Sequence, residues 1–145
     1  MTTTIPVQAK LAAAWTSLTF LYAYVDIFNF FKPGVLDSIH DGKVSTFDVS
    51  APLLTLMLAS VALPGVMVVL SMTLPDRMNR LANIVVAIAL VPYTIFNVAG
   101  EGLEWAVFYA VSIGIEVILL AFILRTAWRR SAWANATTAT PQPVR

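Results

Sequence analysis

Two carboxylates lie inside otherwise apolar stretches of this chain, and they are the side chains best suited to chemistry there. Asp26 lies near the end of a hydrophobic run that begins at Leu11, and Glu116 interrupts the twenty-residue run 105–124. A charge at the bilayer centre costs roughly 2.5–3.5 kcal/mol on insertion scales, so ionisable residues in a span usually face the bundle interior or water. Each acid is therefore a candidate to bind a ligand, an ion or a proton, and a structural hydrogen bond is the alternative role.

Aromatic and uncharged polar side chains accompany both acids at helical spacing. The two stripes are Trp15, Tyr22, Asp26 and Asn29 in the first run, and Trp105, Tyr109, Ser112 and Glu116 in the last. Tyr93 and Asn97 add a third polar edge from the run before the last. Such tyrosines and asparagines more often join membrane helices by hydrogen bonds than contact a ligand, and that interpretation stands beside the functional one.

Depth along the helices indicates which of these groups can meet. At roughly 1.5 Å per residue, Glu116 lies about 16 Å from Trp105, whereas Asp26 lies about 8 Å from Phe31, the end of its run. We therefore expect no direct carboxylate pair. Instead, the sequence predicts an outward-opening polar pocket with Glu116 at its floor. The other candidate ligand-binding residues of this pocket are Tyr22, Asp26, Asn29, Tyr93, Asn97 and Tyr109.

The composition places these runs in a membrane. Of the 145 residues, 59% are hydrophobic and 12% are charged, whereas a soluble domain carries about 25% charged residues. A net charge of +1 with no basic stripe argues against a nucleic-acid partner, because little would displace counterions from phosphates. The chain has no cysteine and one histidine, His40, which argues against thiolate, zinc and haem sites. No metal site is predicted, and the sequence leaves the cofactor unknown.

Four apolar runs are long enough to cross a bilayer as helices. The predicted spans cover about residues 11–31, 51–74, 81–99 and 105–124. Pro64 lies inside the second span, where a kink is expected, and Pro92 lies inside the third. Residues 32–50 are expected to form a turn-rich polar connection with room for a short helix over 35–40, and residues 76–80 a tight basic turn.

The pattern predicts one membrane domain, about 11–128, between a polar segment, 1–10, and a basic tail, 129–145, whose composition predicts disorder. Lysine and arginine gather on the cytoplasmic side of membrane proteins. One side of the predicted bundle receives Lys10, Arg77, Arg80, Arg125, Arg129, Arg130 and Arg145, and the other receives Lys32 and Lys43. The predicted fold class is therefore all-α, a transmembrane antiparallel four-helix bundle with both termini cytoplasmic.

Several short motifs carry a family resemblance. They are Ala14-Trp15, Tyr24-Val25-Asp26, Pro33-Gly34, Leu74-Pro75, Asn79-Arg80, Asn83-Ile84 and the stretch 114–119, GIEVIL. With these motifs, from about Lys10 to Arg130, the chain resembles an uncharacterised family of small bacterial four-span membrane proteins. The resemblance implies four spans and a location in the bacterial inner (plasma) membrane. It implies no activity, cofactor or catalytic residue.

The residues leave competing functions open. The first is a small-molecule or lipid binding module, or a transport-associated one, in which Glu116 changes its protonation; transport by four spans would need a homo-oligomer. The second is a structural or accessory subunit of a larger membrane complex. A membrane enzyme that uses Asp26 or Glu116 as general acid or base is a third, less favoured because the sequence shows no nucleophile–base pair or phosphate-binding loop. The lipid bilayer is the one partner that all three share.

Overall fold

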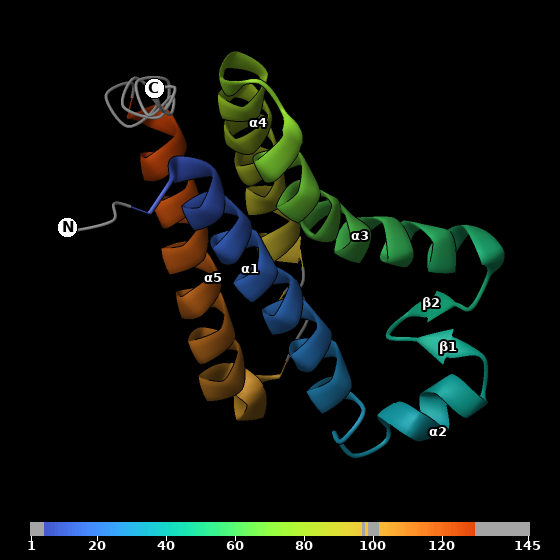
Figure 1. Ribbon diagram of the computed structural model, residues 1–145. Coiled ribbons are helices and arrows are strands. Elements are labelled where there is room, and N and C mark those ends of the chain that lie inside the picture. Colours follow the sequence, from blue (N-terminus) through green and yellow to red (C-terminus); the bar gives the residue numbers. More distant parts are fainter. Residues whose placement is uncertain (1–4, 97, 99–101, 130–145) are drawn as a thin grey trace, which may run out of the picture.

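The computed structural model describes residues 5–96, 98 and 102–129, and helices dominate it (Figure 1). The long helices are α1 (Val7–Asn29), α3 (Ala51–Thr73), α4 (Asp76–Phe96) and α5 (Ala106–Trp128). The short elements are α2 (Val35–His40), strands β1 (Lys43–Val44) and β2 (Phe47–Asp48), and the 3-10 helix η1 (Leu103–Trp105). Residues 130–145, most of the tail for which disorder was predicted, lie outside the described residues.

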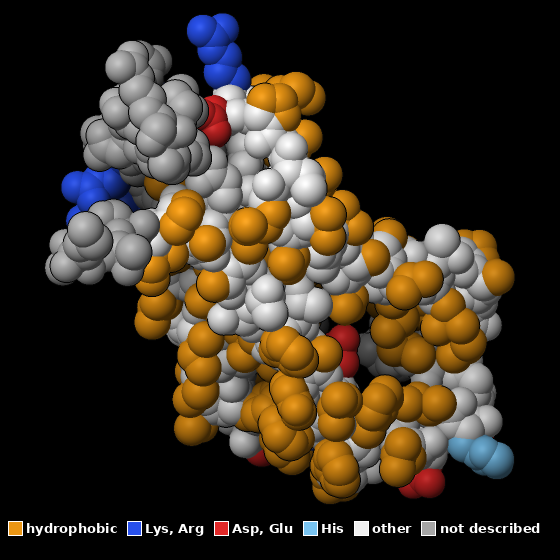
Figure 2. Space-filling model, viewed as in Figure 1, with side chains coloured by type: hydrophobic (Ala, Val, Ile, Leu, Met, Phe, Trp, Pro, Cys, Tyr) orange, Lys and Arg blue, Asp and Glu red, His pale blue; other side chains and the backbone are white. Residues whose placement is uncertain are grey.

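Four segments are long and apolar enough to cross a membrane, which agrees with the four predicted spans. They are Val7–Asn29, Ala51–Thr73, Asp76–Ile95 and Leu103–Trp128. The chain therefore has the architecture of a multi-span membrane protein. Its surface fits that architecture, because hydrophobic side chains cover much of the face seen in Figure 2, far more than a soluble monomer exposes.

The prediction of a tight turn over residues 76–80 is wrong, because these residues form the first turns of α4. The chain reverses at Leu74 and Pro75 alone. The carbonyl of Pro75 already accepts a hydrogen bond from the Asn79 amide at 2.8 Å, the spacing of an α-helix. Asp76 in the first turn adds a negative charge where the helix dipole favours one. A charged sequence after a proline therefore started a helix instead of extending a loop.

The core lies where α1 packs against α3 and α5, with α4 closing the other side of α5. α1 and α5 run antiparallel in Figure 1. The largest fully buried apolar side chains come from α1 up to its midpoint, from the second half of α3 and from the second half of α5: Leu11, Trp15, Leu18, Pro64, Met67 and Ile123. The bundle is thus packed most tightly at the end where the described chain begins.

α3 departs from a regular four-helix bundle. It bends along its length, and its first half leads away from the other helices (Figure 1). Pro64 lies inside the helix, where a proline removes a backbone hydrogen bond and favours the predicted kink. The buried residues of α3 are Pro64, Met67 and Ser71, all at or after this point. Only the second half of α3 is therefore part of the packed core.

The connection between α1 and α3 contains the predicted short helix, α2, over the expected residues. It also contains a small antiparallel hairpin, in which Lys43 pairs with Asp48 and Val44 with Phe47. The all-α prediction is corrected in this one respect. Gly42 and Ser45 both have positive φ, which allows the chain to turn twice within a few residues. Together with the first half of α3, α2 and the hairpin form a lobe beside the bundle, separated from it by a hollow (Figure 2).

Candidate functional site

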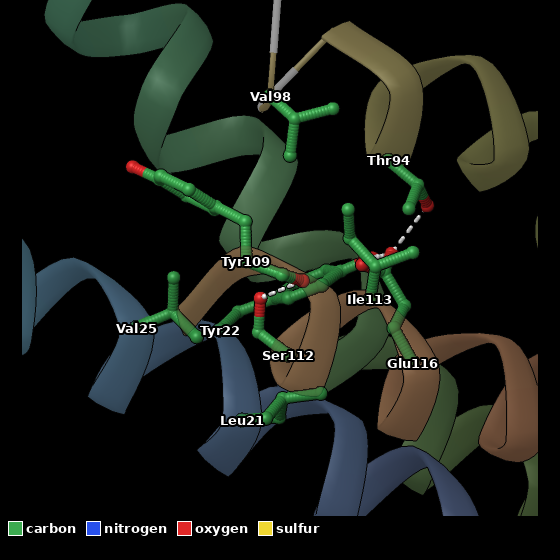
Figure 3. Close-up of a pocket in the computed structure, with 9 residues that line it drawn as sticks. All are labelled: Leu21, Tyr22, Val25, Thr94, Val98, Tyr109, Ser112, Ile113 and Glu116. Carbon is green, nitrogen blue, oxygen red and sulfur yellow. Dashed lines mark hydrogen bonds between the residues drawn. The ribbon is translucent and has the colours of Figure 1, made fainter. Parts of the chain in front are cut away.

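Glu116 is the centre of a buried polar cluster that joins three helices. Its side chain lies on α5 and is only 5% exposed. The phenolic hydroxyl of Tyr22, on α1, donates a hydrogen bond to Glu116 Oε1. The Thr94 hydroxyl, on α4, donates to the same oxygen at 2.5 Å (Figure 3). The carboxyl group is therefore held from two sides by hydroxyl groups of other helices.

A small cavity lies beside this cluster (Figure 3). Its volume is about 30 Å³. The polar side chains among its lining residues are Tyr22, Thr94, Tyr109, Ser112 and Glu116. Because a polar cavity above about 10–15 Å³ can hold one water molecule, this space suits a single water and is too small for an organic ligand. Three of the four residues in the stripe predicted on the last span, Tyr109, Ser112 and Glu116, line this one cavity.

Tyr93 supports the cluster from α4. Its hydroxyl accepts a hydrogen bond from Ser60 Oγ of α3 at 3.2 Å. Its ring packs edge-on against Tyr22, with 5.6 Å between the ring centroids. Ser60 lies in the half of α3 that leaves the bundle, so this contact ties the lobe to the Glu116 cluster.

Tyr109 leads from the cluster toward the end of α1. Its hydroxyl donates to Asn29 Oδ1 at 3.3 Å and accepts from Lys32 Nζ at 2.5 Å. Lys32 is 8% exposed, and its ammonium lies over three aromatic rings: Trp105 at 5.2 Å, Phe108 at 6.0 Å and Tyr109 at 4.4 Å from the ring centroids. Cation–π attraction and the Tyr109 hydroxyl therefore hold this lysine inside an aromatic cage.

The backbone explains how a lysine beyond α1 reaches this cage. After Asn29 the helix tightens, and the amides of Phe30, Phe31 and Lys32 each bond to the carbonyl three residues earlier. Gly34 then takes a left-handed conformation, with φ of 80°, and starts α2 in a new direction. Lys32 therefore stays at the end of α1, next to the start of α5.

A second and larger pocket adjoins the cage. Its volume is about 370 Å³, within the range of small-molecule sites. Its lining residues are Phe28, Phe31, Lys32, Trp105 and Phe108. Among the described residues, the walls are thus aromatic side chains together with the ammonium of Lys32.

The structure brings most of the predicted pocket residues together, but in two groups. Tyr22 and Tyr93 join Glu116, whereas Asn29 joins Tyr109 and Lys32. Tyr109 belongs to both groups, since it also lines the small cavity. As expected from depth, the carboxyl of Glu116 meets hydroxyl groups and not Asp26.

Of the predicted residues that the structure describes, Asp26 stands apart from these groups. Asp26 is exposed on α1 and lines neither pocket. It lies one helical turn from Tyr22 but is turned about 40° around the helix axis, which takes it out of the Glu116 cluster. Asn97 lies outside the described residues. The ligand-binding roles of all seven residues stay predictions.

Sequence reasoning did not select Thr94 or Lys32. Thr94 adjoins the predicted Tyr93, and a hydroxyl in a span is a weak but available signal for a helix contact. In the sequence analysis, Lys32 entered only as one of the basic residues whose distribution predicts the orientation in the membrane. Its position directly after the sequence FNFF was the available sign of an aromatic environment.

A separate buried network joins α1, α3 and α4 at the tightly packed end. Trp15 Nε1 donates to Asn83 Oδ1 at 2.6 Å, and the Ser71 hydroxyl donates to the same oxygen at 3.3 Å. Asn83 Nδ2 donates to the backbone carbonyl and to Oδ1 of Asn79, and Asn79 Nδ2 donates to the backbone carbonyl of Ser71 at 2.6 Å. Three of the residues that carry the family resemblance, Trp15, Asn79 and Asn83, thus join helices.

The described part of the chain contains no group of three or more His, Asp or Glu side chains able to hold a metal ion. The chemistry available in the two groups is therefore that of one carboxyl group, several hydroxyl groups and one ammonium. These groups can bind a proton, a water molecule or a polar ligand.

Four membrane-length helices around a buried carboxyl group define the class of the protein, a multi-span helical membrane protein with a polar interior. The particular family follows from comparison. Residues 6–135 match the family of unknown function DUF6326, and the chain belongs to that family. The resemblance seen in the sequence motifs is thereby confirmed. No curated protein and no solved structure matches the chain.

Proposed function

We propose that the protein is a binding module of the bacterial inner membrane that takes up a small molecule or part of a lipid, with Glu116 as the polar floor of its site. One observation carries the proposal. An ionisable side chain lies inside a membrane-length helix, receives hydroxyl hydrogen bonds from two other helices, and adjoins a water-sized cavity. Because ionisable groups in spans are costly, they mark ligand, ion or proton sites more often than apolar positions do.

The two pockets differ in volume, and we propose a different role for each. The cavity at Glu116 suits one water molecule beside the carboxyl group. The pocket beside Lys32 has the volume for the body of a ligand. Tyr109 links them, since it bonds to Lys32 and lines the cavity at Glu116. A ligand that moves Lys32 or Tyr109 would therefore change the surroundings of Glu116.

The distribution of basic residues supports an orientation with both termini in the cytoplasm. In Figure 2 the visible Lys and Arg side chains lie at the end where α4 begins and α5 ends. Arg77 and Arg125 belong to that end. In membrane proteins, the cytoplasmic side carries an excess of lysine and arginine residues. With this orientation the pocket beside Lys32 opens on the outer side of the membrane.

A structural or accessory subunit is the second candidate, and the shape of α3 favours it. Its first half has exposed Leu54, Leu56 and Leu58 and leads away from the bundle. A helix of a larger complex could pack there. In that case, Ser60 and Tyr93 would transmit the contact to Tyr22, and no ligand would bind.

Native mass spectrometry of the protein released from mild detergent separates the two candidates. We expect a stoichiometric small-molecule or lipid adduct on the wild type that is lost in Glu116→Gln. Glu104→Gln is the matched control, because Glu104 is an exposed acid on η1. Asp26→Asn tests whether the exposed acid contributes. A wild-type protein without any adduct, at unchanged abundance in both Glu variants, would contradict the binding proposal and favour the accessory role.

A further inference from the structure

We infer that the small cavity beside Glu116 binds a single small monovalent cation, a proton or a sodium ion, that exchanges with the solution. Both cations are bound through oxygen atoms, and membrane proteins bind them at ionisable groups inside their spans. The inference goes beyond the proposed function, because the ligand is one ion and not an organic molecule or part of a lipid.

The two oxygens of the Glu116 carboxyl group differ in their surroundings. Oε1 accepts hydrogen bonds from the hydroxyls of Tyr22 and Thr94. Oε2 accepts none from the described residues, although the Glu116 side chain is buried. A buried polar atom without a hydrogen-bond partner is costly. Because Glu116 lines the cavity, a particle in that space can supply the missing partner of Oε2.

A negative charge on Glu116 would need a positive partner. Its two bonded neighbours are uncharged hydroxyls, and no lysine, arginine or histidine of the described residues bonds to it. Lys32 bonds to the Tyr109 hydroxyl instead. An ionised carboxylate inside a span is costly unless a cation neutralises it. Since one carboxylate balances one positive charge, the site favours a proton or a monovalent metal ion over a divalent ion.

The cavity matches such an ion in size and in lining. Its volume of about 30 Å³ admits one particle of the size of a water molecule. Hydroxyl side chains line it from three helices: Tyr22 from α1, Thr94 from α4 and Ser112 from α5 (Figure 3). A hydroxyl that donates its hydrogen still has lone pairs for a cation. Ser112, for example, donates to the Tyr109 carbonyl at 3.1 Å and keeps its own lone pairs.

Other ionisable groups lie around Glu116 on the helices packed against it. In the described part of the chain these neighbours are phenols: Tyr22 on α1, Tyr93 on α4, whose ring packs against Tyr22, and Tyr109 on α5 itself. Two exposed acids, Asp26 on α1 and Glu104 on η1, belong to elements that contact α5 but do not line the cavity. A carboxyl signal that depends on Glu116 is therefore distinguishable from all of them by single substitutions.

Infrared difference spectroscopy of the full chain in reconstituted membranes detects the carboxyl group directly, because its stretching band disappears when the group loses its proton. The pH is raised at constant KCl, within the range in which the bundle stays folded. We expect the wild type to lose one carboxyl band that is absent in Glu116→Gln. Glu104→Gln, which changes an exposed acid, is the matched control and should keep the band. Thr94→Val provides a second assignment, since it keeps the acid but removes one donor and should move the same band.

A second series replaces KCl with NaCl at constant pH and ionic strength. If the site takes sodium, Na⁺ removes the same band by displacing the proton, at a concentration at least tenfold lower than K⁺ requires. If the site takes only a proton, the band follows the pH and ignores the exchange of salts. Either result supports the cation site and decides which ion occupies it.

The inference is overturned if no band that depends on Glu116 responds to either pH or Na⁺ in the wild type. Glu116 would then be a structural group in a fixed protonation state, and its hydroxyl contacts would only join helices.

This result is separable from that of the adduct experiment under the proposed function. An organic adduct that requires Glu116, together with a band that ignores pH and salt, leaves the binding module and removes the cation site. A band that responds to pH or Na⁺, on a protein without any adduct, leaves the cation site and removes the organic ligand.

Discussion

The network around Asn83 gives the sharpest prediction about stability. The Asn83 side chain makes four hydrogen bonds, with Trp15, with Ser71 and twice with Asn79, and it is fully buried. Side-chain hydrogen bonds between membrane helices contribute about 0.6 kcal/mol on average, so Asn83→Ala should lower the free energy of unfolding by about 2–3 kcal/mol. Loss of the packed side-chain volume adds to this.

A double-mutant cycle isolates the bond between α1 and α4. Trp15→Phe removes the indole donor, and Asn83→Ala removes its acceptor. Their coupling energy should be about 0.6–1.7 kcal/mol, because the contact is buried and short. The assay is reversible unfolding in mixed micelles of rising denaturing-detergent fraction. Ser17→Ala, at an exposed position on α1, is the control and should change stability little. A coupling energy near zero would refute the argument that this network holds the helices together.

Three further predictions concern the rest of the molecule. Tyr22→Phe removes the hydroxyl that bonds to Glu116 and should destabilise the bundle by about 0.6–1.7 kcal/mol in the same assay, whereas Tyr24→Phe, at an exposed position, should not. Pro64→Ala restores a helical hydrogen bond and should change the bend of α3, and with it the distance between spin labels at Ser17 and Thr55. An unchanged distance would show that packing, not the proline, bends α3. Because the chain has no native cysteine, Ser38→Cys should react with an impermeant maleimide on intact cells while Arg77→Cys should react only after lysis, and the reverse result would invert the proposed topology.

The membrane architecture could be predicted because it depends on properties that are local in sequence. Apolar runs long enough to span a bilayer, separated by turn residues, leave few alternatives to helices. The short helix α2 and the proline inside α3 were visible in the same way. The start of α4 was misjudged because charged residues were taken for a loop, although Asp76 after Pro75 is a favourable helix start.

The candidate site was predictable only in part, because its contacts cross between helices. Helical spacing places Tyr109 and Glu116 on one face of α5, and the structure confirms that they line one cavity. Spacing cannot show how α1 is rotated against α5, and that rotation decides that Tyr22 meets Glu116 while Asp26 does not. The place of Lys32 depended on a tightened helix end that no periodicity reveals.

Glu116 as a hydroxyl-bonded carboxyl group inside the bundle is the central claim, and infrared spectroscopy tests it most directly. The account predicts a carboxyl stretching band that is absent in Glu116→Gln and that shifts in both Tyr22→Phe and Thr94→Val, since each variant removes one donor to Oε1. A band that stays in place in both hydroxyl variants would contradict the cluster, and with it the binding site built on Glu116.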